Sequence, residues 1–157
     1  MQLQARADVR DEPTKVAATL VLARSSDILP GTADTHVFSV RDTSPPPTVT
    51  FGSATPQVIR ENAGILELPL TLSAPSAYRI RVNFTFSGSA TGTDYAPIPK
   101  AYVDIPPDEF GGALRLQIKN DSVLELPETL KVQVNSAAYA TPDPDAKSQD
   151  FVILDDD

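Results

Sequence analysis

The sequence predicts an all-β protein, an immunoglobulin-like antiparallel β-sandwich of about seven strands. Two observations carry this prediction: apolar residues alternate with polar ones in short segments, and turn-forming residues separate those segments at short intervals. Alternation with a period of two places successive side chains on opposite faces of a strand, so that one face of each segment can be buried. No window combines the apolar spacing of an amphipathic helix with a capping signal, and we therefore expect almost no helix.

The clearest strand is predicted over residues 79–86, where four apolar side chains share one face. The same pattern predicts five further strands and a broken first one. In chain order, the apolar positions are Val49 to Phe51 with Val58 and Ile59; Leu66 to Leu72; Ile80 to Phe86; Val103 and Ile105; Leu114 to Ile118; Leu130 to Val134; and Phe151 and Ile153. Pro69 predicts an edge or a bulge in its strand, because proline cannot donate a hydrogen bond to a neighbouring strand.

Three consecutive prolines at residues 45–47 predict a stiff, extended linker. All the strands above follow this linker, so residues 48–157 are expected to form one complete domain. Residues 1–44 match the end of the chain at a constant offset of 113 residues, and we interpret them as the last three strands of a preceding, incomplete copy. The match places Asp8 on Asp121, Glu12 on Glu125, Phe38 on Phe151 and Asp42 on Asp155, whereas Ala18 and Leu20 fit better one residue out of step.

The composition excludes several kinds of chemistry. The chain has no cysteine and a single histidine, His36, which rules out disulfides, thiolate metal sites and sites with two histidines. Its 21 acidic and 13 basic residues give a net charge of −8, which disfavours nucleic acid and anionic lipid as partners and favours cations. No stretch reaches the roughly 20 apolar residues of a membrane span, so we expect no direct insertion of this segment into a membrane.

Eight acidic residues lie at the ends of predicted strands that share one pole of the sandwich. They are Glu61, Asp94, Asp121, Glu125, Glu128, Asp155, Asp156 and Asp157, and they equal the whole excess of acidic over basic residues. Carboxylates a few ångströms apart repel each other by about 1 to 4 kcal/mol per pair. A Ca²⁺ ion reverses the sign of this interaction and takes about six to eight oxygen ligands in flexible geometry, whereas Mg²⁺ demands a strict octahedron. The sequence therefore predicts a calcium site at this pole.

Several motifs occur together and in a specific order in residues 48–157. They are Val49-Thr50-Phe51, Val58 to Gly64, Ala90-Thr91-Gly92-Thr93-Asp94-Tyr95, Asn120-Asp121 followed by Glu125 and Glu128, and Val152 to Asp157. In these motifs the segment resembles a Calx-beta domain, the calcium-binding sandwich of sodium–calcium exchangers and of long extracellular repeat proteins. The resemblance implies calcium ligands at the eight carboxylates. Asn120, which stands where calcium-binding members carry an aspartate, is kept with them as a candidate ligand.

The incomplete first copy departs further from this pattern. Lys15 falls opposite Glu128 at the offset of 113, and the parts equivalent to those carrying Glu61 and Asp94 are missing. We expect no calcium there. The three strands of this copy would expose backbone edges, so we expect residues 1–44 either to fold against the complete domain or to pair with another chain in a homo-oligomer.

The resemblance implies a non-enzymatic, calcium-binding module of a tandem-repeat protein, in which the ions stiffen or regulate the array. Its partners would be adjacent repeats of the same chain, and its location extracellular or at the cell surface, within a larger exported or membrane-anchored protein. The alternative is a calcium-independent structural or adhesive spacer with a vestigial acidic pole. A hydrolase using Glu125 and Glu128 as paired carboxylates is disfavoured, because tryptophan is absent and aromatic residues make up 6% of the chain.

Overall fold

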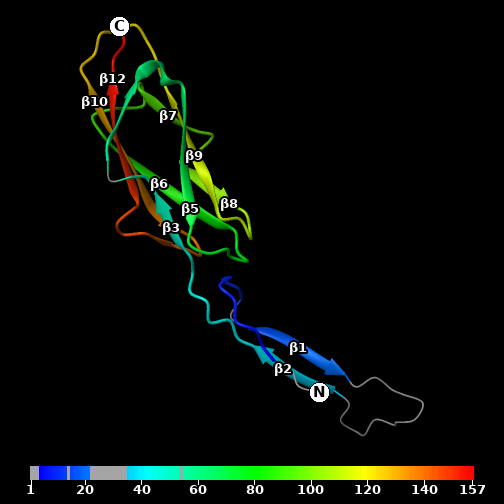
Figure 1. Ribbon diagram of the computed structural model, residues 1–157. Helices are drawn as coiled ribbons and strands as arrows, with labels where there is room; N and C mark the ends of the chain where they lie inside the picture. The colour runs from blue at the N-terminus through cyan, green and yellow to red at the C-terminus, as the bar shows by residue number, and fades with distance from the viewer. Residues whose placement is uncertain (1–3, 14, 22–34, 54) are drawn as a thin grey trace, which may run out of the picture.

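The computed structural model describes residues 4–13, 15–21, 35–53 and 55–157. In this part of the chain the regular structure is β-strand apart from one turn of 3-10 helix, η1 (Glu61–Ala63), so the prediction of an all-β protein is confirmed. None of the described helical residues forms a helix that is long and apolar enough to cross a membrane. The molecule is elongated, with a sandwich at one end and a small two-stranded sheet at the other (Figure 1).

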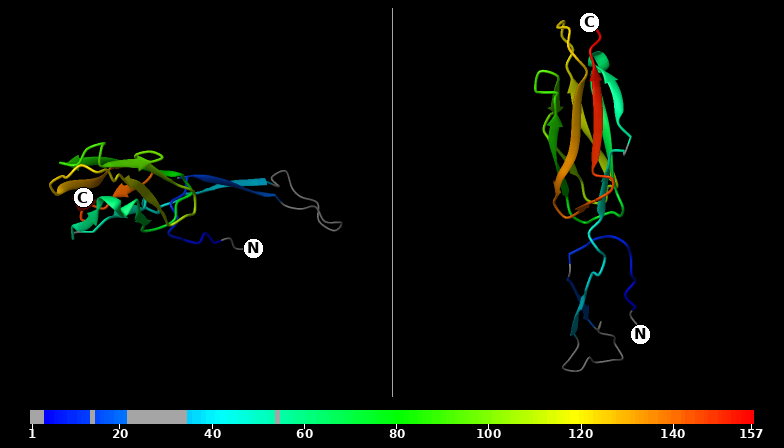
Figure 2. Two further views of the ribbon diagram at one scale, coloured as in Figure 1. Left: turned by 90° about the horizontal axis from the view of Figure 1, so that it is seen from above. Right: turned by 90° about the vertical axis from the view of Figure 1, so that its left-hand side faces the viewer.

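Ten strands form the sandwich. They are β3 (Thr48–Phe51), β4 (Gln57–Arg60), β5 (Ile65–Leu72), β6 (Ile80–Gly88), β7 (Tyr95–Ile98), β8 (Tyr102–Ile105), β9 (Gly111–Ile118), β10 (Glu128–Ala137), β11 (Thr141–Pro142) and β12 (Ser148–Leu154). One sheet has the order β4-β12-β10-β6-β8 and the other the order β11-β3-β5-β9-β7. The two sheets face each other along the long axis of the molecule (Figure 2).

The core lies between the two sheets and is built from the alternating apolar residues. In β6, Ile80, Val82 and Phe84 are buried while the residues between them are exposed or half-buried. The ring of Phe84 packs edge-on against Phe51 of the opposite sheet, with 5.0 Å between the ring centroids. The hydrophobic pattern therefore fixes which face of each strand turns inward, and the loops at the two ends are left to carry polar residues.

The broken first strand is divided between the sheets. β3 pairs with β5, whereas β4 pairs in parallel with β12 in the other sheet. The chain leaves β3 at Gly52, which has a φ of +81°. A Cβ atom at this position would lie 2.4 Å from the carbonyl oxygen of Ser148. A side chain would clash there, so glycine permits the crossover. A second parallel pair joins β11 to β3, so the sandwich is antiparallel except at these two contacts.

The prediction that Pro69 lies at an edge or a bulge is wrong, because β5 occupies the middle of its sheet and pairs with β9 through Pro69 without a shift in register. Pro69 faces Ala113 of β9 on one side. On the other side the ladder between β3 and β5 ends at the pair Phe51 and Leu70, one residue before Pro69. Proline is tolerated in this central strand because its neighbour β3 has already turned away.

Residues 4–44 contain two described strands, β1 (Val16–Val21) and β2 (Thr35–Val40), which pair in an antiparallel sheet. Three strands were predicted for residues 1–44, of which residues 1–3, 14 and 22–34 lie outside the described part. Residues 4–10 form no strand: at the offset of 113 only Gln4 and Ala5 match the end of β9, whereas residues 6–10 match the loop between β9 and β10. Instead, Asp11 forms an isolated parallel bridge with Ser76 of the sandwich.

Candidate metal centre

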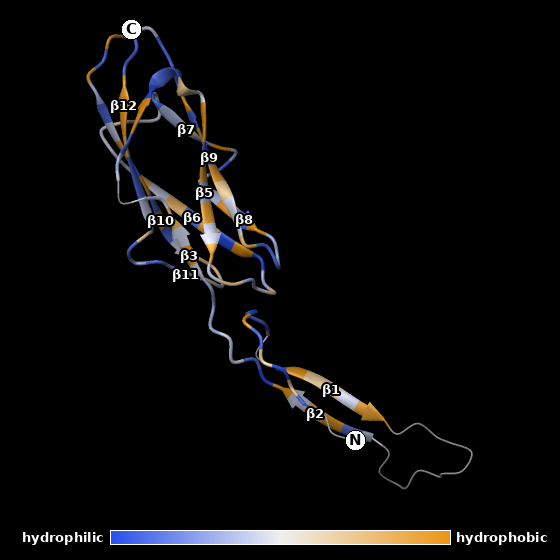
Figure 3. Cartoon of the chain, in the orientation of Figure 1, coloured by the Kyte–Doolittle hydropathy of each residue, from blue (hydrophilic) through white to orange (hydrophobic). Residues whose placement is uncertain are grey.

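The predicted ligands gather at the end of the sandwich that lies away from β1 and β2. This end is formed by η1, the loops β6–β7 and β9–β10, and the residues that follow β12 (Figure 1). The η1 turn is coloured hydrophilic in Figure 3, in contrast to the apolar strands below it. We call this end the acidic pole and define it by Glu61, Asp94, Asp121, Glu125, Glu128, Asp155, Asp156 and Asp157.

Three carboxylates of the acidic pole form a tight group. Asp94, Glu125 and Glu128 each offer an oxygen atom, and these three oxygens all lie within 4.8 Å of one another. Glu128 is positioned by strand pairing, because it begins β10 opposite Ile153 of β12. Three converging carboxylate oxygens, with neither sulfur nor imidazole beside them, form a donor set that suits a hard cation.

Two carboxylate oxygens at the acidic pole are buried and unpaired. Within the described part of the chain, Oε2 of Glu61 and Oε2 of Glu128 have no hydrogen-bond partner. Burial, followed by the negative charges of Glu125 and Asp155, raises the pKa of Glu61, which is 5% exposed. Burial, the charge of Asp94 and a side-chain hydrogen bond to Asp94 raise the pKa of Glu128. A buried carboxylate without a partner is destabilising, and a bound cation would supply the missing partner.

Asp94 is held in place by its own loop. The hydroxyl groups of Thr91 and Thr93 donate hydrogen bonds to its carboxylate at 3.1 and 2.9 Å, and the backbone N–H of Thr91 donates another. Burial alone would raise the pKa of Asp94, which is 5% exposed, but these hydrogen bonds outweigh burial and lower it. Asp94 is therefore kept ionised and fixed in orientation at neutral pH.

Asp155 ties the end of β12 to the β9–β10 loop. Its carboxylate accepts hydrogen bonds from the backbone N–H groups of Glu125 at 2.8 Å and Asp157 at 3.1 Å. These bonds lower the pKa of Asp155 and fix Glu125 beside the strand end. Asp155 acts on the tight group by positioning Glu125.

The remaining candidates lie at the rim. Asp121 accepts a hydrogen bond from the backbone N–H of Val123, and Asp156 accepts one from the side-chain amide of Asn62. Asn120 and Asp157 are exposed, and the amide of Asn120 donates to the carbonyl of Asp121 at 3.3 Å. The structure thus brings Asp94, Glu125 and Glu128 together, surrounds them with Glu61 and Asp155, and leaves Asn120 and Asp157 outside the tight group.

Sequence reasoning missed the residues that orient the carboxylates. Thr91, Thr93 and Asn62 lie in the quoted motifs, but nothing in their spacing shows that they bind Asp94 and Asp156. Lys119 was also missed: its ammonium group donates to the carbonyl oxygen of Gly92, which brings a positive charge to the loop that carries Asp94. This contact depends on the path of the loop that carries Gly92, which the sequence spacing does not reveal.

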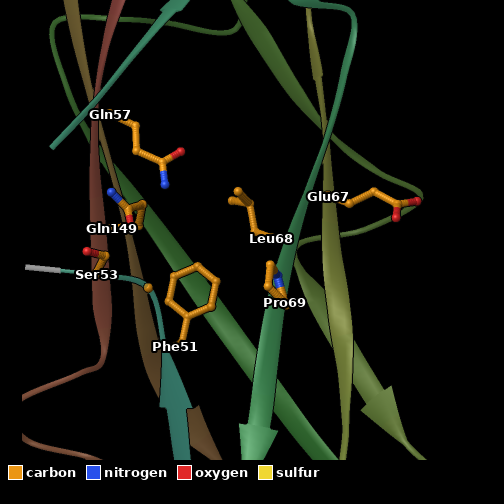
Figure 4. Close-up of a pocket in the computed structure, with 8 residues that line it drawn as sticks. Phe51, Ser53, Gln57, Glu67, Leu68, Pro69 and Gln149 are labelled. Carbon is orange, nitrogen blue, oxygen red and sulfur yellow. The ribbon is translucent and has the colours of Figure 1, made fainter. Parts of the chain in front are cut away.

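A depression of about 210 Å³ lies where β3 leaves its sheet (Figure 4), and none of the lining residues that the structure describes belongs to the acidic pole. Phe51, Leu68 and Pro69 supply its apolar wall. Glu67 is the one carboxylate among its described lining residues, and Figure 4 shows this side chain directed away from Phe51. Glu67 instead pairs with Arg115 at 3.2 Å. The described lining therefore presents no pair of carboxylates for acid and base catalysis.

The fold has counterparts among solved structures. No family model matches the sequence, and no curated protein matches it. The crystal structure of the apo form of the Calx CBD1 domain has a TM-score of 0.58 at 20% identity, over 71% of this chain and 98% of that chain. The calcium binding domain CBD12 of CALX1.1 has a TM-score of 0.57 at 20% identity, over 69% of this chain and 44% of that chain. The Calx CBD2 domain has a TM-score of 0.50 at 14% identity, over 68% of this chain and 85% of that chain.

These similarities show that the sandwich has the fold of a Calx-beta domain, as the sequence predicted. The match spans less than half of the CBD12 chain, so this sandwich corresponds to part of that protein.

The shifted pKa values predict how the stability of the metal-free protein depends on pH. Between the ordinary glutamate pKa of 4.5 and the raised pKa values of Glu61 and Glu128, the folded state binds more protons than the unfolded state. The free energy of unfolding should therefore increase as the pH falls through this window. The lowered pKa values of Asp94 and Asp155 act oppositely, and their stabilisation is lost only below the ordinary aspartate pKa of 3.8.

Urea denaturation in EDTA at a series of pH values measures this dependence. We expect stability to rise as the pH falls towards the ordinary glutamate pKa of 4.5 and to fall again below the ordinary aspartate pKa of 3.8. A steady loss of stability from pH 7 downwards would contradict the buried, unpaired state of Glu61 and Glu128.

Proposed function

We propose that this protein is a non-enzymatic, calcium-binding module and that its acidic pole holds Ca²⁺. The observation that carries the proposal is the pair of buried, unpartnered carboxylate oxygens of Glu61 and Glu128, beside a group of three carboxylates within 4.8 Å. Calcium is the cation that fits best, because the ligands are oxygens on several loops and tolerate an irregular arrangement. One of the similar solved structures is itself described as a calcium binding domain, which supports the same function here.

In this proposal Asp94, Glu125 and Glu128 are the inner ligands, and the buried, unpartnered Oε2 of Glu61 supplies a further carboxylate oxygen. Asp155 positions Glu125. The carboxylates of Asp121 and Asp156 lie at the rim with Asn120 and Asp157, and they would hold a further ion or bind through water. The residues of the pole bring negative charge and orientation, and the ion supplies the positive charge that relieves their repulsion.

We further propose that the module belongs to a tandem array in an extracellular or cell-surface protein. Residues 1–44 would be part of a preceding copy, residues 45–47 the linker, and residues 48–157 the complete domain. Calcium at one pole would stiffen the array against adjacent repeats. No other described strand pairs with β1 or β2, and their outer edges would offer strand pairing to a second chain.

The second candidate is a structural spacer that does not use calcium. Two observations favour it: Asn120 carries no charge, and the ammonium group of Lys119 already lies against the loop that carries Asp94. In this alternative Lys119 offsets part of the negative charge that calcium would otherwise neutralise.

Thermal melts in excess EDTA, in millimolar CaCl₂ and in MgCl₂ distinguish the two functions. A ligand that binds only the folded state stabilises it by about 2.7 kcal/mol at a hundredfold excess over Kd. For a chain of this size we expect calcium to raise Tm by several degrees and magnesium to have a smaller effect. Equal melting temperatures in EDTA and calcium would favour the spacer.

A further inference from the structure

The loop Asp8–Glu12 repeats the local structure of the loop Asp121–Glu125. In the first loop, Oδ1 of Asp8 accepts a hydrogen bond from the backbone N–H of Arg10 at 3.0 Å. In the second, Oδ1 of Asp121 accepts one from the backbone N–H of Val123 at 2.8 Å. Both pairs follow the offset of 113 residues that relates the two parts of the sequence.

The strand ends repeat as well. The carboxylate of Asp155 binds the backbone N–H groups of Glu125 and Asp157, and that of Asp42 binds those of Glu12 at 2.9 Å and Ser44 at 3.0 Å. The sheet formed by β1 and β2 also has the register of β10 and β12 when Val40 is placed on Ile153 and Val16 on Glu128. The described residues between 8 and 44 therefore repeat the loop and strand-end hydrogen bonds of the acidic pole.

The described residues of this first copy differ from the metal centre at one ligand position. In the structural register Val16 occupies the place of Glu128, whereas Glu12 is the counterpart of Glu125. The guanidinium of Arg10 forms an ion pair with Glu12. A side chain of the protein thus supplies the positive charge at the position where the complete domain presents its candidate cation ligands.

The same loop docks on the opposite end of the sandwich, at a surface that we call the base and define by Pro75–Ala77 and Asp108. The guanidinium of Arg10 donates two hydrogen bonds to the carboxylate of Asp108, at 2.6 and 3.0 Å. Asp11 inserts beside Arg10: its backbone N–H donates to Pro75, and its carbonyl accepts from Ala77 at 2.7 Å.

The side chains at the centre of this contact are buried. The hydroxyl of Ser76 donates to the carboxylate of Asp11 at 3.0 Å, and the two residues are 2% and 8% exposed. Ion pairs between exposed side chains are weak, but a buried hydrogen bond to a charged group beside a backbone bridge fixes the geometry of a contact. The loop and the base therefore meet through a defined interface.

We propose that the loop Asp8–Glu12 and the base form a metal-free junction between consecutive units, in which the Arg10 guanidinium takes the place of a bound cation. The guanidinium binds Glu12 in residues 4–44 and Asp108 in the sandwich. It thereby fixes the angle between these two parts of the chain without calcium. The inference is independent of calcium binding at the acidic pole of the complete domain.

Distances between two spin labels test this junction in the full chain. The protein has no cysteine, so Ser39→Cys in β2 and Ser87→Cys in β6, both exposed, provide the only two labelling sites. Pulsed electron–electron double resonance on the spin-labelled chain in EDTA should give one narrow distance distribution. Adding CaCl₂ should leave this distribution unchanged. Arg10→Ala should broaden it. Asp108→Asn should do the same from the other side, and asparagine tolerates the φ of +67° at this position.

Arg6→Ala is the matched control, because it removes the same charge from the same segment and Arg6 makes no described ion pair. Its distance distribution should match that of the unmodified chain. A broad distribution in EDTA that calcium narrows would show a metal-dependent junction and overturn the proposal. Narrow distributions in both Arg10→Ala and Asp108→Asn would show that the Arg10 contact does not hold the units. Melting temperatures in EDTA and calcium report separately on the acidic pole, so the failure of either proposal can be recognised.

Discussion

Replacing Glu128 by glutamine is expected to stabilise the metal-free protein and to weaken calcium binding by at least about tenfold. Oε2 of Glu128 is buried without a partner, and burial and the charge of Asp94 raise its pKa. Glutamine keeps the shape of the side chain and removes a charge that faces other negative charges, so Tm in EDTA should rise. Removing one ligand charge weakens attraction to the ion, and about 1.4 kcal/mol already corresponds to a factor of ten in Kd.

The matched control for this variant is Glu109→Gln. Glu109 is exposed in the turn between β8 and β9, next to the base and away from the acidic pole. This substitution makes the same change in net charge, and we expect it to leave both Tm in EDTA and the calcium response unchanged. If Glu109→Gln weakened the calcium response as much as Glu128→Gln, calcium would be acting through the net charge of the protein and not through a site.

Replacing Leu116 by alanine is expected to remove about 2 to 5 kcal/mol from the free energy of unfolding. Leu116 is fully buried in β9 and lies between Leu66 of β5 and Pro97 of β7. Its removal would leave a cavity in the middle of the core that strands on both sides prevent from closing. Urea denaturation should show a lower midpoint with an unchanged slope, since the same surface is exposed on unfolding.

Leu126→Ala is the control for this core substitution. Leu126 is 86% exposed in the β9–β10 loop, so the same chemical change should alter the free energy of unfolding by no more than about 0.5 kcal/mol. Equal losses in the two variants would contradict the assignment of Leu116 to the core.

Much of the fold follows from the sequence because strand period and burial agree. Val82 and Phe84 alternate with polar residues and are buried in β6, as predicted. The strand β7 was missed, since Tyr95–Ile98 contains Pro97 and all four residues are half-buried, which leaves no alternation to detect. This strand forms because its backbone pairs with β9, which comes later in the chain. The parallel contact of β4 with β12 likewise depends on distant residues.

The candidate site followed from the sequence only in outline. Counting strand ends placed the acidic residues at one pole, but it gave no distances between them. The tight group depends on the hydrogen bonds that Thr91 and Thr93 make to Asp94 and on the bond that places Glu125 beside Asp155. Such contacts follow from the paths of the loops. Sequence spacing therefore could not separate the residues of the tight group from the exposed Asn120 and Asp157, which it ranked equally.

Isothermal titration calorimetry of CaCl₂ into the protein, after removal of metal with EDTA and buffer exchange, is the most direct test of the acidic pole as a calcium site. The unmodified chain should show saturable binding, and Glu128→Gln should show binding at least about tenfold weaker, because a ligand charge is missing. Glu109→Gln should bind like the unmodified chain. Absence of saturable binding at millimolar calcium, or equal binding by Glu128→Gln and the unmodified chain, would contradict the calcium site and favour the spacer.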